Sequence, residues 1–324
     1  MENDLSILIL SCGTRNKIVQ YFKEELNGSG LVMATDSSHL APALYEADKH
    51  FIVPRIDEEG YLEKILSICK DYNIKGVLSL IDPELTLLAE YKQKFLDIGT
   101  LPIISEVDVI KTSFDKYKMF KFLRKHGFKT IKSYIDKEEF YNDVEKGKID
   151  YPVFIKPVTG SASLNINKVT SKEEVELLFS QFNKLMIQEF MDGIEYGVDA
   201  YIDMFSSRPV SIFIKEKLNM RAGETDKSVS IKNDELFSLI TDFIKKTDLK
   251  GIIDIDVFKV NEEYYISEVN PRFGGGYPHA HGCDVNMIKM IVNNVVGNEN
   301  IDKIGQYKKD IYMLKYSDMK IIGE

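Results

Sequence analysis

Apolar and polar positions follow two different periods along the first third of the chain. Residues 16–26 place apolar side chains at positions 18, 19, 22 and 26, which is the spacing of one helix face. Residues 61–73 predict a second helix, and short apolar runs predict strands at 6–10, 31–36, 76–81 and 101–105. Because strands alternate with helices, this part predicts a parallel sheet with right-handed crossovers, which is an α/β unit.

Several small or polar residues directly follow the predicted strands. Ligands of parallel sheets lie outside the carboxyl ends of the strands. The candidates to line such a site are Gly13, Thr14, Arg15, Asp36, Asp82 and Glu84. Ordinary turn chemistry is the alternative for each of them. The first turn holds one glycine rather than G-x-G-x-x-G, so a dinucleotide site is not predicted.

The pattern changes near residue 111. Residues 112–128 predict one helix with Thr112 or Ser113 as its N-cap and Gly127 just after its end. Further helices are predicted at 171–179, 233–247 and 285–296, and strands at 151–156, 185–191, 194–205, 209–218, 251–260 and 264–271. The later strands alternate apolar with polar side chains, which is typical of antiparallel sheets with one wet face. This half therefore predicts an α+β unit.

Composition and charge exclude some partners. The chain has 324 residues, with 42 Lys and Arg against 51 Asp and Glu, so its net charge is −9. Nucleic acids and anionic membranes attract basic surfaces, so neither is an expected partner. No apolar run approaches the roughly 20 residues of a membrane-spanning helix. The three cysteines, Cys12, Cys69 and Cys283, are odd in number and far apart, which suits a reducing compartment and a cytoplasmic protein.

A predicted hairpin near the C-terminus gathers carboxylates on one face. If residues 261–263 form a three-residue turn, Asp256 pairs with Glu268 and Asp254 pairs with Asn270. Side chains two positions apart share a sheet face, so these four polar residues lie together. The apolar residues between them form the core side of the hairpin, and they are Ile253, Ile255, Val257 and Val269.

Opposed acids in a strand pair need a compensating cation. Directly paired side chains have Cβ atoms about 5 Å apart, where like charges are destabilising. Hard oxygen ligands suit Mg²⁺ or Mn²⁺. A water-screened sheet face is the alternative, and the hairpin alone leaves both open. The pair His279 and His281 is only weak evidence for a further metal site.

Three basic residues occupy positions that suit an anion. Lys156 ends an apolar strand and precedes the small-residue loop 159–163, whose backbone could approach phosphate oxygens. Lys116 lies in the first turn of its helix, where the helix dipole disfavours a cation. Arg272 leads into Gly274, Gly275 and Gly276, which indicate either a close approach to a ligand or a flexible turn.

The order of these motifs resembles the ATP-grasp superfamily, and most of all its single-unit members that are similar to the carbamoyl-phosphate-synthase large chain. The motifs are DK in a helix, PVFIKPVTGSAS, MIQEFMDGIEYGVDAYI, DIDVF and ISEVNPRFGGG. The resemblance implies a pre-ATP-grasp Rossmann-like domain at 1–110, a small ATP-grasp lobe at 111–187 and a large lobe with the metal site at 188–324. The implied fold is α/β with a parallel sheet, followed by two α+β lobes with antiparallel sheets.

The resemblance also implies roles for individual residues. Lys116 and Lys156 would contact the nucleotide phosphates, and Glu195 would hold the ribose hydroxyls. Arg272 would lie beside the transferred phosphoryl group, so Arg272 and Lys156 are the catalytic candidates. The implied phosphate loop is Thr159, Gly160, Ser161, Ala162 and Ser163, the adenine hinge is Gln188, Glu189, Phe190 and Met191, and the magnesium ligands are Asp256, Glu268 and Asn270.

The implied function is an ATP- and Mg²⁺-dependent carboxylate–amine ligase that works through an acyl-phosphate and releases ADP. Its partners would be small carboxylate and amine molecules, and the family suggests a homodimer, although no interface stripe stands out. A nucleotide-binding partner subunit without its own ligation, or a carboxylate kinase that releases its product, are the alternatives. Arg221 and Lys227 are candidates to face the substrate, with plain surface charge as the alternative. Asp254 has no implied role.

Overall fold

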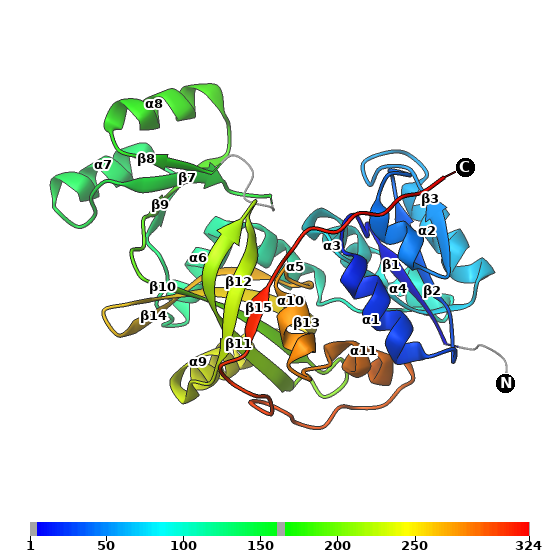
Figure 1. Cartoon of the computed structure of the whole chain (residues 1–324). Helices are drawn as coiled ribbons and strands as arrows, with labels where there is room; N and C mark the ends of the chain where they lie inside the picture. Colours follow the sequence, from blue (N-terminus) through cyan, green and yellow to red (C-terminus); the bar gives the residue numbers. More distant parts are fainter. Residues whose placement is uncertain (1–4, 161–165, 324) are drawn as a thin grey trace.

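The computed structural model describes residues 5–160 and 166–323, and Figure 1 shows three sheets joined in chain order. The first sheet is parallel, with the strand order β3-β2-β1-β4-β5. Its strands are β1 (Ser6–Leu10), β2 (Val32–Asp36), β3 (Lys49–Ile52), β4 (Ile74–Ser79) and β5 (Leu101–Pro102). Its helices are α1 (Asn16–Leu26), η1 (Pro42–Glu46), α2 (Tyr61–Asp71), α3 (Asp82–Glu90) and α4 (Lys92–Asp97). The predicted parallel α/β unit is confirmed.

A small antiparallel sheet follows and lies apart from the first one (Figure 1). Its strand order is β6-β9-β7-β8. Its strands are β6 (Ser133–Tyr134), β7 (Val153–Pro157), β8 (Asn167–Val169) and β9 (Leu185–Glu189), and helices α7 (Lys137–Glu145) and α8 (Lys172–Gln181) cover it.

The third sheet has six strands in the order β14-β13-β10-β11-β12-β15, and all its pairs are antiparallel. Its strands are β10 (Ile194–Ile202), β11 (Pro209–Arg221), β12 (Glu224–Ile231), β13 (Gly251–Val260), β14 (Glu263–Asn270) and β15 (Tyr312–Leu314). Helices α5 (Val107–Phe114), α6 (Lys116–Lys125), α9 (Asp234–Lys245) and α10 (Tyr277–Gly282) accompany it, whereas α11 (Met287–Val295) lies against α1 and β4 of the first unit. The predicted fold class is therefore confirmed in all three sheets. The domain boundaries at 110 and 187 stay predictions.

Two apolar cores hold the large sheet in place. Val198, Ile212, Ile253 and Ile255 on one face pack with side chains of α9 and α6. A second core joins this sheet to the first unit, because Tyr201 and Phe213 pack together with side chains of α1, β1 and α11. The polar side chains between the core residues therefore point to one common face.

The predicted register of the acidic hairpin is confirmed, although its predicted turn is wrong. Asp256 pairs with Glu268, and Asp254 pairs with Asn270. The turn has two residues, Asn261 and Glu262, whose φ angles of 49° and 63° are left-handed, as a tight hairpin turn requires. A bulge between Asp256 and its neighbour restores the register that the shorter turn would have shifted.

The helix predicted at 112–128 is two helices. α5 ends at Phe114 and α6 begins at Lys116, so neither Thr112 nor Ser113 is the N-cap. The carboxylate of Asp115 caps α6 by accepting a hydrogen bond from Lys118 N at 2.9 Å. Lys116 is therefore the first helical residue. Across the described ranges, no helix is long and apolar enough to cross a membrane.

Candidate active site

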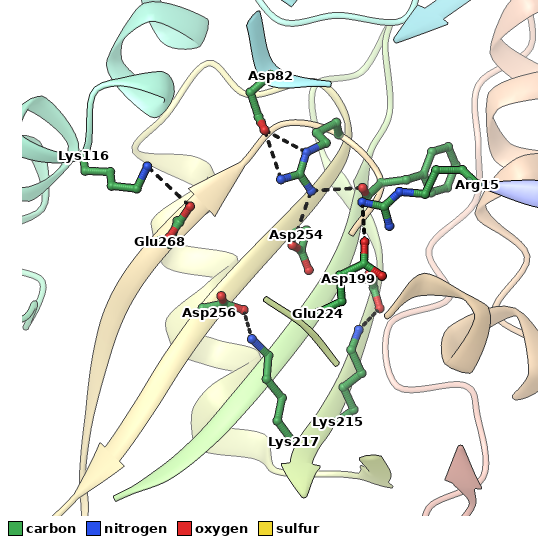
Figure 2. A network of polar contacts seen from close by, with 12 residues as sticks. Arg15, Asp82, Lys116, Asp199, Lys215, Lys217, Glu224, Asp254, Asp256 and Glu268 are labelled. Carbon is green, nitrogen blue, oxygen red and sulfur yellow. Dashed lines mark hydrogen bonds and ion pairs between the residues drawn. The ribbon is translucent and has the colours of Figure 1, made fainter. Parts of the chain in front are cut away.

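The polar face of the large sheet collects charged side chains from four adjacent strands (Figure 2). They are Glu195 and Asp199 of β10, Lys215 and Lys217 of β11, Asp254 and Asp256 of β13, and Glu268 of β14, and the neutral amide of Asn270 lies beside them on β14. Gly197 leaves room for this arrangement, because a Cβ atom there would lie 3.0 Å from Cε of Lys215 and 3.1 Å from Cε of Lys217. Lys215 therefore reaches Asp199 on β10, whereas Lys217 reaches across β10 to Asp256 on β13.

Lys217 lies between two of the acids. Its Nζ is 2.5 Å from Oδ1 of Asp256 and 2.8 Å from Oε1 of Glu195. Burial lowers the pKa of Lys217, but the nearby Asp256 and Glu195 outweigh burial and hold it above its usual value. Burial raises the pKa of Glu195, and Lys217 opposes that rise only in part. Lys217 thus supplies part of the positive charge that the sequence predicted for this acidic face.

Sequence reasoning missed both Lys215 and Lys217. The alternation of 209–218 predicts that the two lysines share one face of their strand. Which side chains lie next to them on that face depends on the order of the strands in the sheet. β11 pairs with β10 in a register that sets Lys215 opposite Gly197. Had this pairing been known, the two lysines would have been found with the acids.

The magnesium candidates fit a hard divalent cation. Glu268 lies opposite Asp256, and its only ion pair in the described ranges is with Lys116, at 3.8 Å, beyond hydrogen-bond distance. Asn270 makes no side-chain hydrogen bond to any described residue. Within residues 5–160 and 166–323, no group of three or more His, Cys, Asp or Glu could hold a metal. Two carboxylates and an amide nevertheless suit Mg²⁺, which binds through one or two carboxylates together with substrate phosphates.

Two lysines from outside the large sheet, Lys116 of α6 and Lys156 of β7, lie near the carboxylates of Asp256 and Glu268. Lys156 of β7 is 6% exposed, and its ammonium has no hydrogen bond or ion pair with any residue that the structure describes. Burial lowers the pKa of Lys156, with Glu268 opposing and Lys116 adding to that effect. Nζ of Lys116 donates to the carbonyl oxygen of Gly160 at 2.5 Å. A buried ammonium without a partner is costly, which fits a site that receives an anion.

The phosphate loop and the adenine hinge are described in part. Thr159 pairs with Asp115 in an isolated antiparallel β-bridge. Ser161, Ala162 and Ser163 lie outside the described residues. The Gln188 side chain is engaged inside the small lobe, since its Nε2 donates to Oγ of Ser133 at 3.1 Å.

The last hinge residues lie between the small lobe and β10. The backbone N–H of Glu189 donates to Lys132 O at 2.9 Å, and a contact of this residue with an adenine edge stays a prediction. Phe190 packs against Phe154 with ring centroids 5.5 Å apart, and Met191, which follows it, is partly buried.

Arg272 is held between two parts of the chain. Its Nε and one terminal nitrogen each lie 3.1 Å from Oδ2 of Asp82, a residue of the first unit. The other terminal nitrogen lies 3.8 Å from Oδ2 of Asp254 and donates to the carbonyl oxygen of Phe273 at 3.1 Å. Burial lowers the pKa of Arg272, but Asp82 and Asp254 outweigh it and raise the pKa overall.

The glycines after Arg272 provide close approach to charged side chains. A Cβ atom on Gly274 would lie 2.3 Å from Oδ1 of Asp254. The same atom on Gly276 would lie 2.6 Å from Cε of Lys215. Gly275 is equally crowded by charged groups. Burial raises the pKa of Asp254 to about 7.

Some other candidates from the sequence lie apart from this face. Arg221 pairs with Asp226 at 2.7 Å and is more than half exposed. Lys227 is exposed on β12. The Glu84 carboxylate is fully buried with Tyr61 and Ser79, and burial raises its pKa to about 8.

The N-terminal turn and the histidine pair serve local packing. Asp36 accepts a hydrogen bond from Gly13 N at 2.9 Å. His279 bonds to Ser228 and Ile311, whereas the His281 ring stacks on Tyr21, so the two histidines have separate surroundings.

Comparison with known sequences agrees with this architecture. A family model described as "PylC-like, N-terminal domain" matches residues 7–104, and one described as "ATP-grasp domain" matches residues 113–276. A carbamoyl-phosphate synthase of Methanobrevibacter smithii is 25% identical over 95% of this chain and 85% of its own length. A D-alanine–D-alanine ligase of Bacillus licheniformis is 31% identical over 49% of this chain, and the match spans about half of that relative.

Solved structures share the fold. The biotin carboxylase domain of a Hydrogenobacter thermophilus 2-oxoglutarate carboxylase, determined with MgADP and bicarbonate, matches with a TM-score of 0.75 at 14% identity, covering 95% of this chain and 73% of that one. An L-amino acid ligase of Bacillus licheniformis matches with a TM-score of 0.68 at 16% identity, covering 93% and 76%. With the ATP-grasp match spanning about half of the chain, the protein belongs to the ATP-grasp family of ligase enzymes that use ATP and Mg²⁺, as the order of its motifs predicted.

Proposed function

We propose that this protein joins a carboxylate to an amine, using ATP and Mg²⁺ and forming an acyl-phosphate on the way. The observation that carries the proposal is the opposed pair Asp256 and Glu268, facing the buried ammonium of Lys156, which has no partner among the described residues. Phosphoryl transfer depends on positioning and charge neutralisation more than on covalent help from the protein. A face with both acids for a metal and cations for phosphates supplies these two requirements.

Each residue has a separate task in this proposal. Asp256, Glu268 and Asn270 would hold Mg²⁺, which when bound supplies Lewis-acid neutralisation of the phosphates. Lys116 and Lys156 would bind phosphate oxygens.

Arg272 would orient the phosphoryl group that moves to the carboxylate. Its two contacts to Asp82 keep the planar guanidinium in one orientation. The amine would then displace phosphate from the acyl-phosphate, so ADP and phosphate would both leave.

Named relatives support a ligase that joins carboxylates to amines. Besides the D-alanine–D-alanine ligases, a coenzyme gamma-F420-2:alpha-L-glutamate ligase of Methanococcus maripaludis is 27% identical over 68% of this chain. A carboxylate kinase and a partner subunit without ligation remain the competing functions.

The test is release of ADP by the purified protein when it is presented with panels of carboxylic acids and amines, with product masses measured in parallel. A product heavier by a phosphoryl group would instead identify a kinase. Nucleotide binding without turnover for any pair would instead favour the partner subunit.

A matched pair of variants on one hairpin checks the site. Glu268→Gln removes a metal ligand and should abolish turnover. Glu263→Gln changes an exposed acid of the same strand whose side chain contacts Lys129 and Tyr265 at the surface, and it should leave turnover unchanged. Full turnover in Glu268→Gln would refute the proposed site.

We also propose a cytoplasmic location and a homodimer. All three cysteines are free and buried, which supports a reducing compartment, and fractionation of the source cells tests the location. The Hydrogenobacter thermophilus biotin carboxylase domain is described as a dimer, which supports the second proposal. The mass of the purified protein in solution tests it.

A further inference from the structure

A second charged group includes Arg15 and Glu224, which lie on the side of Asp254 away from Glu268 (Figure 2). One terminal nitrogen of Arg15 lies 3.0 Å from Oε1 of Glu224, and Nζ of Lys315 lies 2.9 Å from Oε2 of the same carboxylate. The three residues come from the turn after β1, the start of β12 and the segment after β15. We call Arg15, Glu224 and Lys315 the distal triad.

The distal triad packs directly against the backbone of Gly275. A Cβ atom on Gly275 would lie 2.6 Å from Cδ of Glu224 and 2.9 Å from a terminal nitrogen of Arg15. Any side chain at 275 would displace both charged groups. The central glycine is therefore needed to keep them side by side.

Solvent reaches the site at the distal triad. The side chains of Arg15 and Lys315 are each 25% exposed and that of Glu224 is 40% exposed, whereas those of Arg272 and Asp82 are at most 10% exposed. Burial lowers the pKa of Arg15, and Glu224 opposes that effect. Burial raises the pKa of Glu224, but Arg15 and Lys315 outweigh burial and lower it overall. The exposed acid is therefore ionised beside two cations.

A ligand that replaces these internal contacts must offer both signs of charge. The planar guanidinium of Arg15 matches a carboxylate in a two-point contact, and the Glu224 carboxylate accepts from an ammonium. A purely anionic ligand would leave Glu224 facing a second negative charge. A purely cationic one would meet both Arg15 and Lys315.

We propose that the distal triad binds the non-reacting end of one substrate and that this end is a zwitterionic amino-carboxylate of the α-amino-acid type. Arg15 takes its carboxylate, Glu224 takes its ammonium, and the reacting end extends toward Arg272. This inference rests on the ligase function proposed above, and it assigns Arg15 and Glu224 a role in substrate selection.

Ligand-induced stabilisation tests the binding directly and needs no turnover. The intact protein, with MgADP present, is melted with each proteinogenic L-amino acid and with D-alanine, with ethylamine and propionate as the analogues that keep only one charge. At least one amino acid should raise the melting temperature, and neither analogue should. Absence of any amino-acid effect, or an equal effect of an analogue, would overturn the proposal.

Two neutral variants then locate the contacts. Arg15→Gln and Glu224→Gln should each weaken amino-acid binding by roughly 10- to 150-fold, because each removes one hydrogen-bonded contact to a charged group. Arg55→Gln is the matched control, since Arg55 is exposed on the same unit and its guanidinium pairs with nearby Asp57 at the surface. Binding that persists in both neutral variants would contradict the assignment.

A charge exchange separates binding from a structural ion pair. In the triple variant Arg15→Glu, Glu224→Arg and Lys315→Glu both ion pairs of the triad can form again, so the melting temperature without ligand should recover. Amino-acid binding should stay lost, because the carboxylate and ammonium would now meet like charges. Recovery of both the melting temperature and amino-acid binding would show that the ion pair is only structural. Failure of the ligase function shows itself separately, as absence of ADP release with any acid and amine.

Discussion

Replacing Lys215 with methionine should destabilise the protein far more than a surface substitution does. Lys215 and Asp199 form an ion pair in which the side chains are 1% and 0% exposed. The second oxygen of Asp199, Oδ1, is buried and has no hydrogen-bond partner among the residues that the structure describes. Lys215→Met keeps most of the side-chain volume but leaves a buried carboxylate without a counter-charge.

The expected loss is about 3–5 kcal/mol in the free energy of unfolding, the usual effect of breaking a buried pair from one side. That is a large share of the roughly 5–15 kcal/mol that stabilises a typical domain. The control is the double variant Lys215→Met with Asp199→Leu, which removes both charges and should be close to the native stability or above it. Urea unfolding curves with a common slope measure all three proteins.

The pH dependence gives a second readout. Burial already raises the pKa of Asp199, and Lys215 opposes that rise. Without the lysine the folded-state pKa rises further, so the folded variant binds a proton that the unfolded chain does not. Stability then decreases as pH rises through that pKa, and the deficit of Lys215→Met should shrink in acid. A loss below roughly 1 kcal/mol, or a loss that is the same at every pH, would refute the reasoning.

Three further substitutions probe the site. Gly274→Ala places a methyl group against the carboxylate of a β13 side chain and should lower both stability and turnover. Gly282→Ala is the control, because a methyl group there meets nothing within 4 Å and should change neither property. Equal melting temperatures of the two variants would contradict this reasoning. Asp82→Asn weakens the hold on Arg272 and should lower kcat on the order of tenfold to a hundredfold while the KM for ATP stays constant, as steady-state kinetics would measure. Lys156→Met removes a buried charge that has no partner within residues 5–160 and 166–323, so thermal melts should show a more stable ligand-free protein that ATP no longer stabilises. An unchanged ATP effect would argue against a phosphate contact.

The period of the side chains along a strand decides which residues share a face. The pairs Asp256 with Glu268 and Asp254 with Asn270 followed from alternation and one assumed turn. The turn was wrong, yet the pairing was right because the bulge compensates for the missing turn residue. Local sequence therefore determined the acidic face, since the strand period of two is a property of the backbone itself.

Tertiary structure decided which charges meet. The contact between Asp82 and Arg272 joins residues 190 positions apart, and nothing in either local sequence indicates it. Lys217 of β11 reaches Asp256 of β13 only because β10 lies between these strands and carries Gly197 at the crossing. Periodicity assigns a side chain to a face, but its neighbours depend on strand order and on the docking of separate units. Those are set by burial of apolar surface across the whole chain, which is why the sequence by itself determined the acidic face and only the fold determined its partners.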